Sequence, residues 1–127
     1  MPELSRHFIN PGPEVVRQSR RLVADSLDAW GVRRRRDDAV LSTSELVTNV
    51  LLHADSDHLA LHLWLRHRCL RLEVHDRIHG PVSLCTPSAC DVTGRGLLLL
   101  QRVADRWGSY DRPPGLGKVV FAEFEIA

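Results

Sequence analysis

The chain has 127 residues, of which 43% are hydrophobic and 26% are charged, and its formal net charge is +1. A chain of this length forms one domain with a substantial core, and this composition excludes a disordered protein. The small net charge gives no general electrostatic reason to expect binding to nucleic acid or to acidic membranes.

The first part of the chain predicts a short strand and a helix. Residues 5–9 predict the strand, which the breakers at positions 11–13 end. From Glu14 to Trp30 apolar residues recur at helical spacing, and Gly31 follows as a C-terminal cap would.

A basic run, Arg33–Arg36, precedes a second predicted helix. Asp37 and Asp38 suit the positive first turn of this helix, which we expect to run to about Ala54. The basic run could contact nucleic acid, but the net charge of +1 and the lack of interleaved aromatic residues favour a solvated helix start.

The middle of the chain predicts a β-hairpin. Leucines alternate with other residues over positions 59–66, and apolar residues alternate again from Leu70 to Val74. Asp76 falls in phase with the apolar set of the second strand, and a carboxylate on a core-facing position needs a partner. Residues 77–93 show no clear period and predict a loop.

The last part of the chain predicts a helix and two strands. Gly94-Arg95-Gly96 opens an apolar helix that we expect to run from Leu97 to Trp107 and to stop at Gly108. Two strands follow, residues 109–112 and 118–126. This order of elements predicts an α+β sandwich, in which residues 1–127 form a single domain with helices on one face of a largely antiparallel sheet.

The cysteines and the hydropathy indicate a compartment. Cys69, Cys85 and Cys90 are an odd and sparse set, which fits reduced thiols better than a disulfide framework. No apolar run is long enough to cross a bilayer, and the first residues lack the apolar segment of a signal peptide. We therefore expect a cytoplasmic domain without membrane contact.

Three polar side chains stand four residues apart inside the second predicted helix. Glu45, Asn49 and His53 therefore share one stripe of that helix. The stripe is either a solvated face or the lining of a polar site, and the sequence pattern supports both interpretations equally. A carboxylate beside a carboxamide suits the binding of Mg²⁺ and the orientation of a nucleophile.

Two further segments offer candidate sites. The glycines of Gly94-Arg95-Gly96 would let backbone N–H groups approach an anion at a helix start, although glycines there also serve purely steric roles. His75, His79, Cys85 and Cys90 could bind zinc, but their spacing matches no close-paired zinc pattern.

Three segments resemble, in order and spacing, the sequence boxes of the histidine-kinase-like ATPases. Residues 45–54, Glu-Leu-Val-Thr-Asn-Val-Leu-Leu-His-Ala, resemble the N box, and residues 74–81, Val-His-Asp-Arg-Ile-His-Gly-Pro, resemble the first glycine box. Residues 94–108 resemble the second glycine box, and residues 117–124 resemble the final strand. The resemblance covers nearly the whole chain and is closest to the compact anti-sigma-factor serine kinase branch of actinomycete type.

The resemblance implies a Bergerat-type fold, a two-layer sandwich in which about three helices cover a mixed, mostly antiparallel sheet, with bound ATP or ADP and Mg²⁺. It implies that Asn49 coordinates Mg²⁺, that Glu45 is the catalytic base positioning the attacking hydroxyl, and that Asp76 accepts a hydrogen bond from the adenine amino group. The ATP-binding residues that it implies are Asn49, His53, Asp76, Gly80, Gly94, Arg95, Gly96 and Leu97.

The resemblance leaves two functions open. The first is a serine/threonine protein kinase that regulates transcription by phosphorylating a STAS-type anti-sigma-factor antagonist, by sequestering a sigma factor, or by both, as a monomer or a homodimer and without direct nucleic-acid contact. The second is a weak or inactive nucleotide-binding module that acts only by sequestering its partner. Glu45 and Asn49 favour the kinase. Ile78, where the wider superfamily has glycine, and a short lid from Gly80 to Thr93 favour the module.

Overall fold

A computed structural model describes residues 1–53, 57–76, 94–113 and 117–126, with the backbone alone described for His53 and residues 94–98. These residues form β1 (Glu3–Ile9), α1 (Glu14–Ala29), α2 (Arg36–His53), β2 (His58–Arg66), β3 (Cys69–Asp76), α4 (Gly94–Val103), β4 (Arg106–Asp111) and β5 (Lys118–Glu125).

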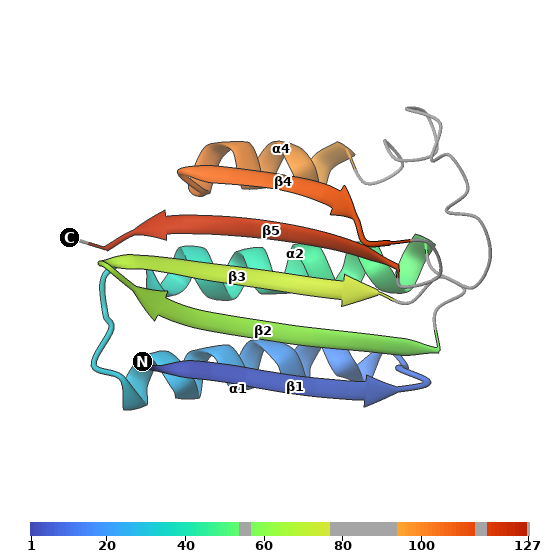
Figure 1. The fold of residues 1–127 in the computed structure, drawn as a ribbon, viewed down its shortest axis with the longest axis horizontal. Coiled ribbons are helices and arrows are strands. Elements are labelled where there is room, and N and C mark those ends of the chain that lie inside the picture. The colour runs from blue at the N-terminus through green and yellow to red at the C-terminus, as the bar shows by residue number, and fades with distance from the viewer. Residues whose placement is uncertain (54–56, 77–93, 114–116, 127) are drawn as a thin grey trace.

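The strands form one sheet in the order β1-β2-β3-β5-β4 (Figure 1). The expected sheet was mixed and mostly antiparallel, and each pair of neighbouring strands described here is antiparallel. β2 and β3 form the predicted hairpin, which turns at His67 and Arg68 with φ angles of 50° and 61°. Two successive residues with positive φ give the turn a twist that matches the twist of the strands.

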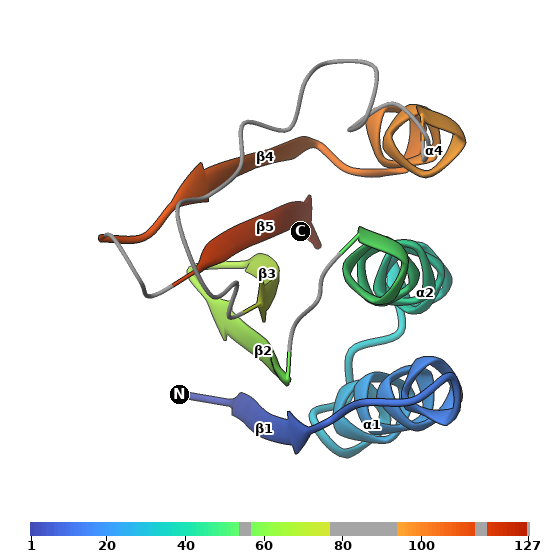
Figure 2. The same cartoon turned by 90° about the vertical axis from the view of Figure 1, so that its right-hand side faces the viewer.

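The helices α1, α2 and α4 lie on one side of the sheet (Figure 2). No helix of the described residues covers its other face, which we call the open face. α2 is the central helix, since it contacts α1, α4 and the strands β3 and β5. The core lies between the two layers, where the fully buried side chains of the sheet include Leu59, Leu61, Leu63, Leu70, Leu72 and Phe124. The α+β two-layer sandwich expected from the sequence is confirmed.

The boundary between α4 and β4 differs from the prediction. The helix was expected to continue to Trp107 and to stop at Gly108, but α4 ends at Val103 and both residues lie in β4. Asp105 draws the chain into the sheet: its N–H donates to the carbonyl of Glu123 at 2.9 Å, and its carboxylate accepts the N–H of Glu125 at 2.6 Å. An apolar run alone does not distinguish a helix end from a strand start, because the deciding contacts come from β5.

Two arginines of the basic run have structural roles. Arg36 holds Asp28 of α1 through two hydrogen bonds, Nε to Oδ1 at 2.7 Å and Nη2 to Oδ2 at 3.1 Å. Arg33 and Arg34 are exposed. Arg35 is mostly buried and makes more contacts than Arg36 does.

Arg35 connects the start of α2 to the other end of the chain. Its backbone has φ +67°, and its guanidinium binds Asp38 at 2.9 Å and Asp105 at 2.8 Å. The same guanidinium donates to the carbonyls of Val103 and Glu125. Its Cζ atom lies 5.4 Å from the centre of the Phe124 ring. We call this set of contacts the Arg35 tie. It fixes the α4–β4 junction against α2.

Candidate active site

Glu45 and Asn49 lie on α2 at the border of the face that packs on the sheet. The buried residues of this helix follow helical spacing: Ala39, Ser42, Thr43, Leu46, Val47 and Val50. Glu45 and Asn49 are half-buried and stand one helical turn apart. His53 ends the helix. Glu45 and Asn49 therefore lie at the border between core and surface, which is intermediate between a solvated face and the lining of a polar site.

The outer side of α2 is more exposed than its composition suggests. Leu41 is 40% exposed and Leu52 is 65% exposed. With Glu45 and Thr48 they follow the spacing i, i+4, i+7, i+11, so the four side chains share one stripe. Glu45 is thus accessible from outside, between two apolar side chains.

Asp76 is the last residue of β3, on the side of the sheet that faces the helices. It is 7% exposed, and its Oδ1 accepts the backbone N–H of Lys118 at 3.0 Å. Burial raises the pKa of Asp76 above its ordinary value, and the hydrogen bond from Lys118 opposes this shift. The sequence predicted a core-facing carboxylate in need of a partner, and the partner is this amide of β5.

The start of α4 completes the candidate site. Gly94, Arg95, Gly96 and Leu97 form its first turn, as expected, although the side chains of this turn are outside the described set. Gly80 lies outside the described residues as well. A helix N-terminus presents unpaired N–H groups to an anion such as phosphate.

The elements that carry these residues converge at one end of the molecule. In Figure 1 the C-terminal end of α2, the end of β3 and the N-terminal end of α4 all lie on the right-hand side. α2 contacts both β3 and α4. Asn49 in the last turns of α2, Asp76 at the end of β3 and the first turn of α4 are therefore carried to the same end of the molecule.

The described part of the chain contains no group of three or more histidine, cysteine or acidic residues arranged to hold a metal ion by themselves. Three of the residues considered for zinc, His79, Cys85 and Cys90, lie outside that part. Mg²⁺ in nucleotide sites takes one or two protein ligands and completes its shell with phosphates and waters. The amide oxygen of Asn49 fits this requirement, because its side chain is only half-buried.

One group of polar residues was missed by the sequence analysis. His7, His58, His62 and His75 gather on the open face of the sheet, opposite the helices. The alternation of β2 and β3 indicated which histidines point outward, but the pairing of β1 with β2, which brings in His7, has no local signal.

Comparison with known proteins identifies the family of this chain. No helix in the described ranges is both long enough and apolar enough to cross a membrane. A search of curated proteins finds no match to the chain. The family model described as "Histidine kinase-like ATPase domain" matches residues 9–123, which include α2, Asp76 and α4. The chain therefore belongs to the histidine kinase-like ATPase domain family, a membership that implies nucleotide binding.

Proposed function

We propose that this protein is an ATP-dependent serine kinase that phosphorylates an anti-sigma-factor antagonist and regulates transcription by also binding a sigma factor. The convergence of α2, the end of β3 and the start of α4 at one end of the molecule supports this function most directly. The family membership supports nucleotide binding at that end.

The proposed roles follow from the chemistry of each group. Asp76 accepts the backbone N–H of Lys118 through Oδ1. As a buried carboxylate it would also accept a hydrogen bond from the adenine amino group. Asn49 would hold Mg²⁺ through its amide oxygen, and the first turn of α4 would bind the phosphates. Bound Mg²⁺ would supply charge neutralisation for the transferred phosphoryl group. Glu45, one turn from Asn49, would accept the proton of the attacking serine hydroxyl.

The surface around Glu45 supports a protein substrate. Leu41 and Leu52 are the exposed apolar side chains that flank Glu45 and Thr48 along α2. Exposed apolar groups beside a polar centre are typical of a protein contact surface. A serine on a docked protein could therefore reach Glu45 from outside the core.

A second function remains open because of the sequence around the lid. Ile78 replaces the glycine that the wider superfamily has two residues after the aspartate. A bulky residue there disfavours close approach of the backbone to a phosphate. This favours a module that binds nucleotide and sequesters its partner without turning ATP over.

The test of the kinase uses the wild-type protein. Radiolabelled ATP is incubated with the protein and with co-encoded candidate antagonist proteins, with and without Mg²⁺. We expect label on one antagonist, only when Mg²⁺ is present. Calorimetric binding of Mg²⁺–ATP without transfer of label to any antagonist would decide for the sequestering module.

Asn49→Ala is expected to weaken binding of Mg²⁺–ATP by about tenfold or more, since it removes a ligand that holds the metal and the phosphates. Titration calorimetry with ATP in the presence and absence of Mg²⁺ measures this loss. Gln18→Ala, which removes an exposed carboxamide from α1, is the matched control and should bind as the wild type does. Equal affinities for the two variants would remove Asn49 from the site.

Asp76→Asn is expected to weaken adenine-nucleotide binding by about tenfold or more, because a hydrogen bond to a charged group is worth about 1.5–3 kcal/mol. The same change should leave the free energy of unfolding unchanged or higher. The pKa of Asp76 is raised in the folded state, so its contribution to stability is lost as the pH rises through that pKa. At neutral pH asparagine removes the cost of a buried charge and keeps an acceptor for the Lys118 N–H.

Calorimetry with ADP and urea unfolding of the same variant measure both quantities. Asp25→Asn, on the exposed side of α1, is the control for the loss of a carboxylate. Wild-type affinity in Asp76→Asn would contradict the assignment of the adenine contact.

A further inference from the structure

Four histidines surround one alanine on the open face of the sheet. Ala60 of β2 pairs with His7 of β1 on one side and with His75 of β3 on the other. His58 and His62 stand two positions before and after Ala60, on the same face of the strand. We call this arrangement the histidine cross. Ala60 is 2% exposed, so its methyl group forms a floor and the four imidazoles form a rim.

The imidazoles of the histidine cross are in contact with one another. Nδ1 of His7 lies 2.9 Å from Nε2 of His58, and the ring centres of His62 and His75 are 4.6 Å apart. The ring centres of His7 and His62 are 5.8 Å apart. A pocket of about 450 Å³ lies over the cross, and Asp76 and Arg112 complete its lining. This volume is in the range of small-ligand sites.

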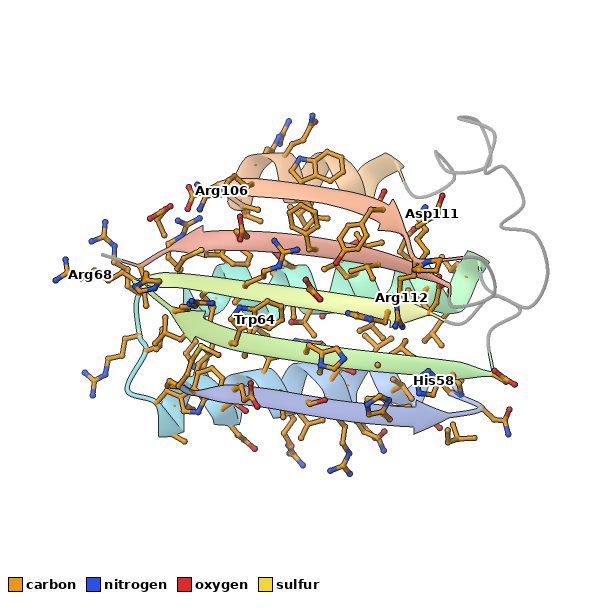
Figure 3. All side chains as sticks on the ribbon, viewed as in Figure 1. His58, Trp64, Arg68, Arg106, Asp111 and Arg112 are labelled. Atoms are coloured by element: carbon orange, nitrogen blue, oxygen red, sulfur yellow. The ribbon has the colours of Figure 1, made fainter. Side chains whose placement is uncertain are left out.

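Figure 3 shows where Arg112 lies relative to the cross. Arg112 and His58 are at the same end of the sheet, whereas Arg68 is at the opposite end. Arg112 follows β4 and is exposed, so its guanidinium can reach a ligand without displacing a core contact.

Positive charge would gather in this pocket when the histidines are protonated. Burial lowers the pKa of His62 below its ordinary value, and charges on His75, on His7 and on Arg112 lower it further, while Glu73 opposes them. The carboxylates beside the pocket already have partners. Glu73 binds His75 at 2.8 Å and Arg71 at 2.7 Å. Asp76 lines the pocket at the end of β3, but it lies in phase with the core-facing residues of that strand and accepts the Lys118 N–H.

Two observations favour an anion over a transition-metal ion as the ligand. Arg112 lines the pocket and would repel a cation. In addition, no three ligating side chains of the described ranges converge on one point.

A doubly charged phosphoryl group is compatible with the imidazoles and the guanidinium that line this pocket. Its oxygens accept hydrogen bonds from imidazole N–H groups and from a guanidinium, and its charge compensates for the charge of the protonated rings. The pocket is larger than one phosphate requires, which leaves room for the group that carries it. We propose that the histidine cross and Arg112 bind the phosphoryl group of a phosphate monoester, on the face of the sheet opposite the helices, and take up protons on binding.

Sulfate and inorganic phosphate are the probes, because sulfate keeps its double charge throughout the titration range of histidine. The Cε1–H proton signals of the histidines are followed by NMR as each anion is added. We expect sulfate to move the signals of the histidine cross and not that of His67, which lies in the β2–β3 turn. Its affinity should rise by about tenfold between about pH 7.5 and about pH 6, since each proton taken up contributes up to tenfold per pH unit.

Two substitutions test the pocket against a matched control. Arg112→Gln and His62→Gln should each lower sulfate affinity by about tenfold, whereas Arg68→Gln, at the other end of the sheet, should not. A phosphoserine peptide and glycerol phosphate then distinguish a phosphorylated protein from a small ester, by which of the two binds more tightly. Asn49→Ala should weaken nucleotide binding and keep the sulfate-induced shifts, which separates this site from the nucleotide site.

Four outcomes would overturn the proposal. The first is that sulfate moves no signal of the histidine cross at either pH. The second is that Arg112→Gln and Arg68→Gln bind sulfate equally well. The third is that Asn49→Ala abolishes the shifts. The fourth is that Zn²⁺ or Ni²⁺ binds the cross at about pH 7.5 more tightly than sulfate does at about pH 6, which would make it a metal site.

Discussion

Glu45→Ala is expected to reduce phosphorylation of the antagonist by about 10²–10⁴-fold, because a positioned general base contributes that much to rate. Nucleotide affinity should change little. Glu45 is half-buried and one turn from Asn49, so in the proposed mechanism it contacts the attacking hydroxyl and Asn49 holds the metal. Initial rates of label transfer and calorimetry with Mg²⁺–ATP measure the two effects separately.

Two further variants test whether the loss of phosphorylation comes from the basicity of Glu45. Glu45→Gln keeps the size and polarity of the side chain and removes its basicity, so it should be nearly as inactive as alanine. Glu3→Ala, at the exposed start of β1, is the control for the removal of a carboxylate. A Glu45→Ala protein that labels the antagonist at the wild-type rate would keep the kinase and exclude Glu45 from its mechanism.

Arg35→Ala is expected to lower the free energy of unfolding by about 2–3 kcal/mol. Removing one partner of a fully buried ion pair costs about 3–5 kcal/mol, because the other charge is left unpaired. Asp38 and Asp105 are each more than a third exposed, so water compensates for part of that cost. Urea unfolding followed by circular dichroism measures the change.

Arg34→Ala is the matched control, since Arg34 belongs to the same basic run and is exposed. Its expected effect on unfolding is within about 0.5 kcal/mol. Arg35→Lys should recover only part of the stability, because one ammonium group cannot reach the carboxylates and carbonyls that the planar guanidinium bridges. Equal stability of Arg35→Ala and Arg34→Ala would mean that the Arg35 tie contributes nothing.

The elements with a clean period could be predicted from the sequence to within one or two residues. Both helices before residue 54 and the β2–β3 hairpin have the predicted type and nearly the predicted bounds. The α4–β4 boundary could not be predicted, because Asp105 is directed by two residues of β5 that lie about twenty positions away. Local pattern carries no information about such a partner.

The candidate site likewise contains features that the sequence predicted and features that it could not predict. The phase of β3 predicted that Asp76 faces the core, and the structure places it there with a partner. The exposure of Leu41 and Leu52 was not predicted, since it depends on which helices flank α2. The histidine cross required the register of β1 on β2, which joins His7 to a residue 51 positions away.

The Arg35 tie also has a consequence for the order of folding. Its bonds to Val103, Asp105 and Glu125 join residues 68, 70 and 90 positions apart, whereas the β2–β3 hairpin closes within a few residues. Contacts between distant residues require the largest loop closures, so they form after the local elements. Interactions absent from the folding transition state act on the unfolding rate alone. Arg35 should therefore lengthen the lifetime of the folded molecule and leave the speed of its formation almost unchanged.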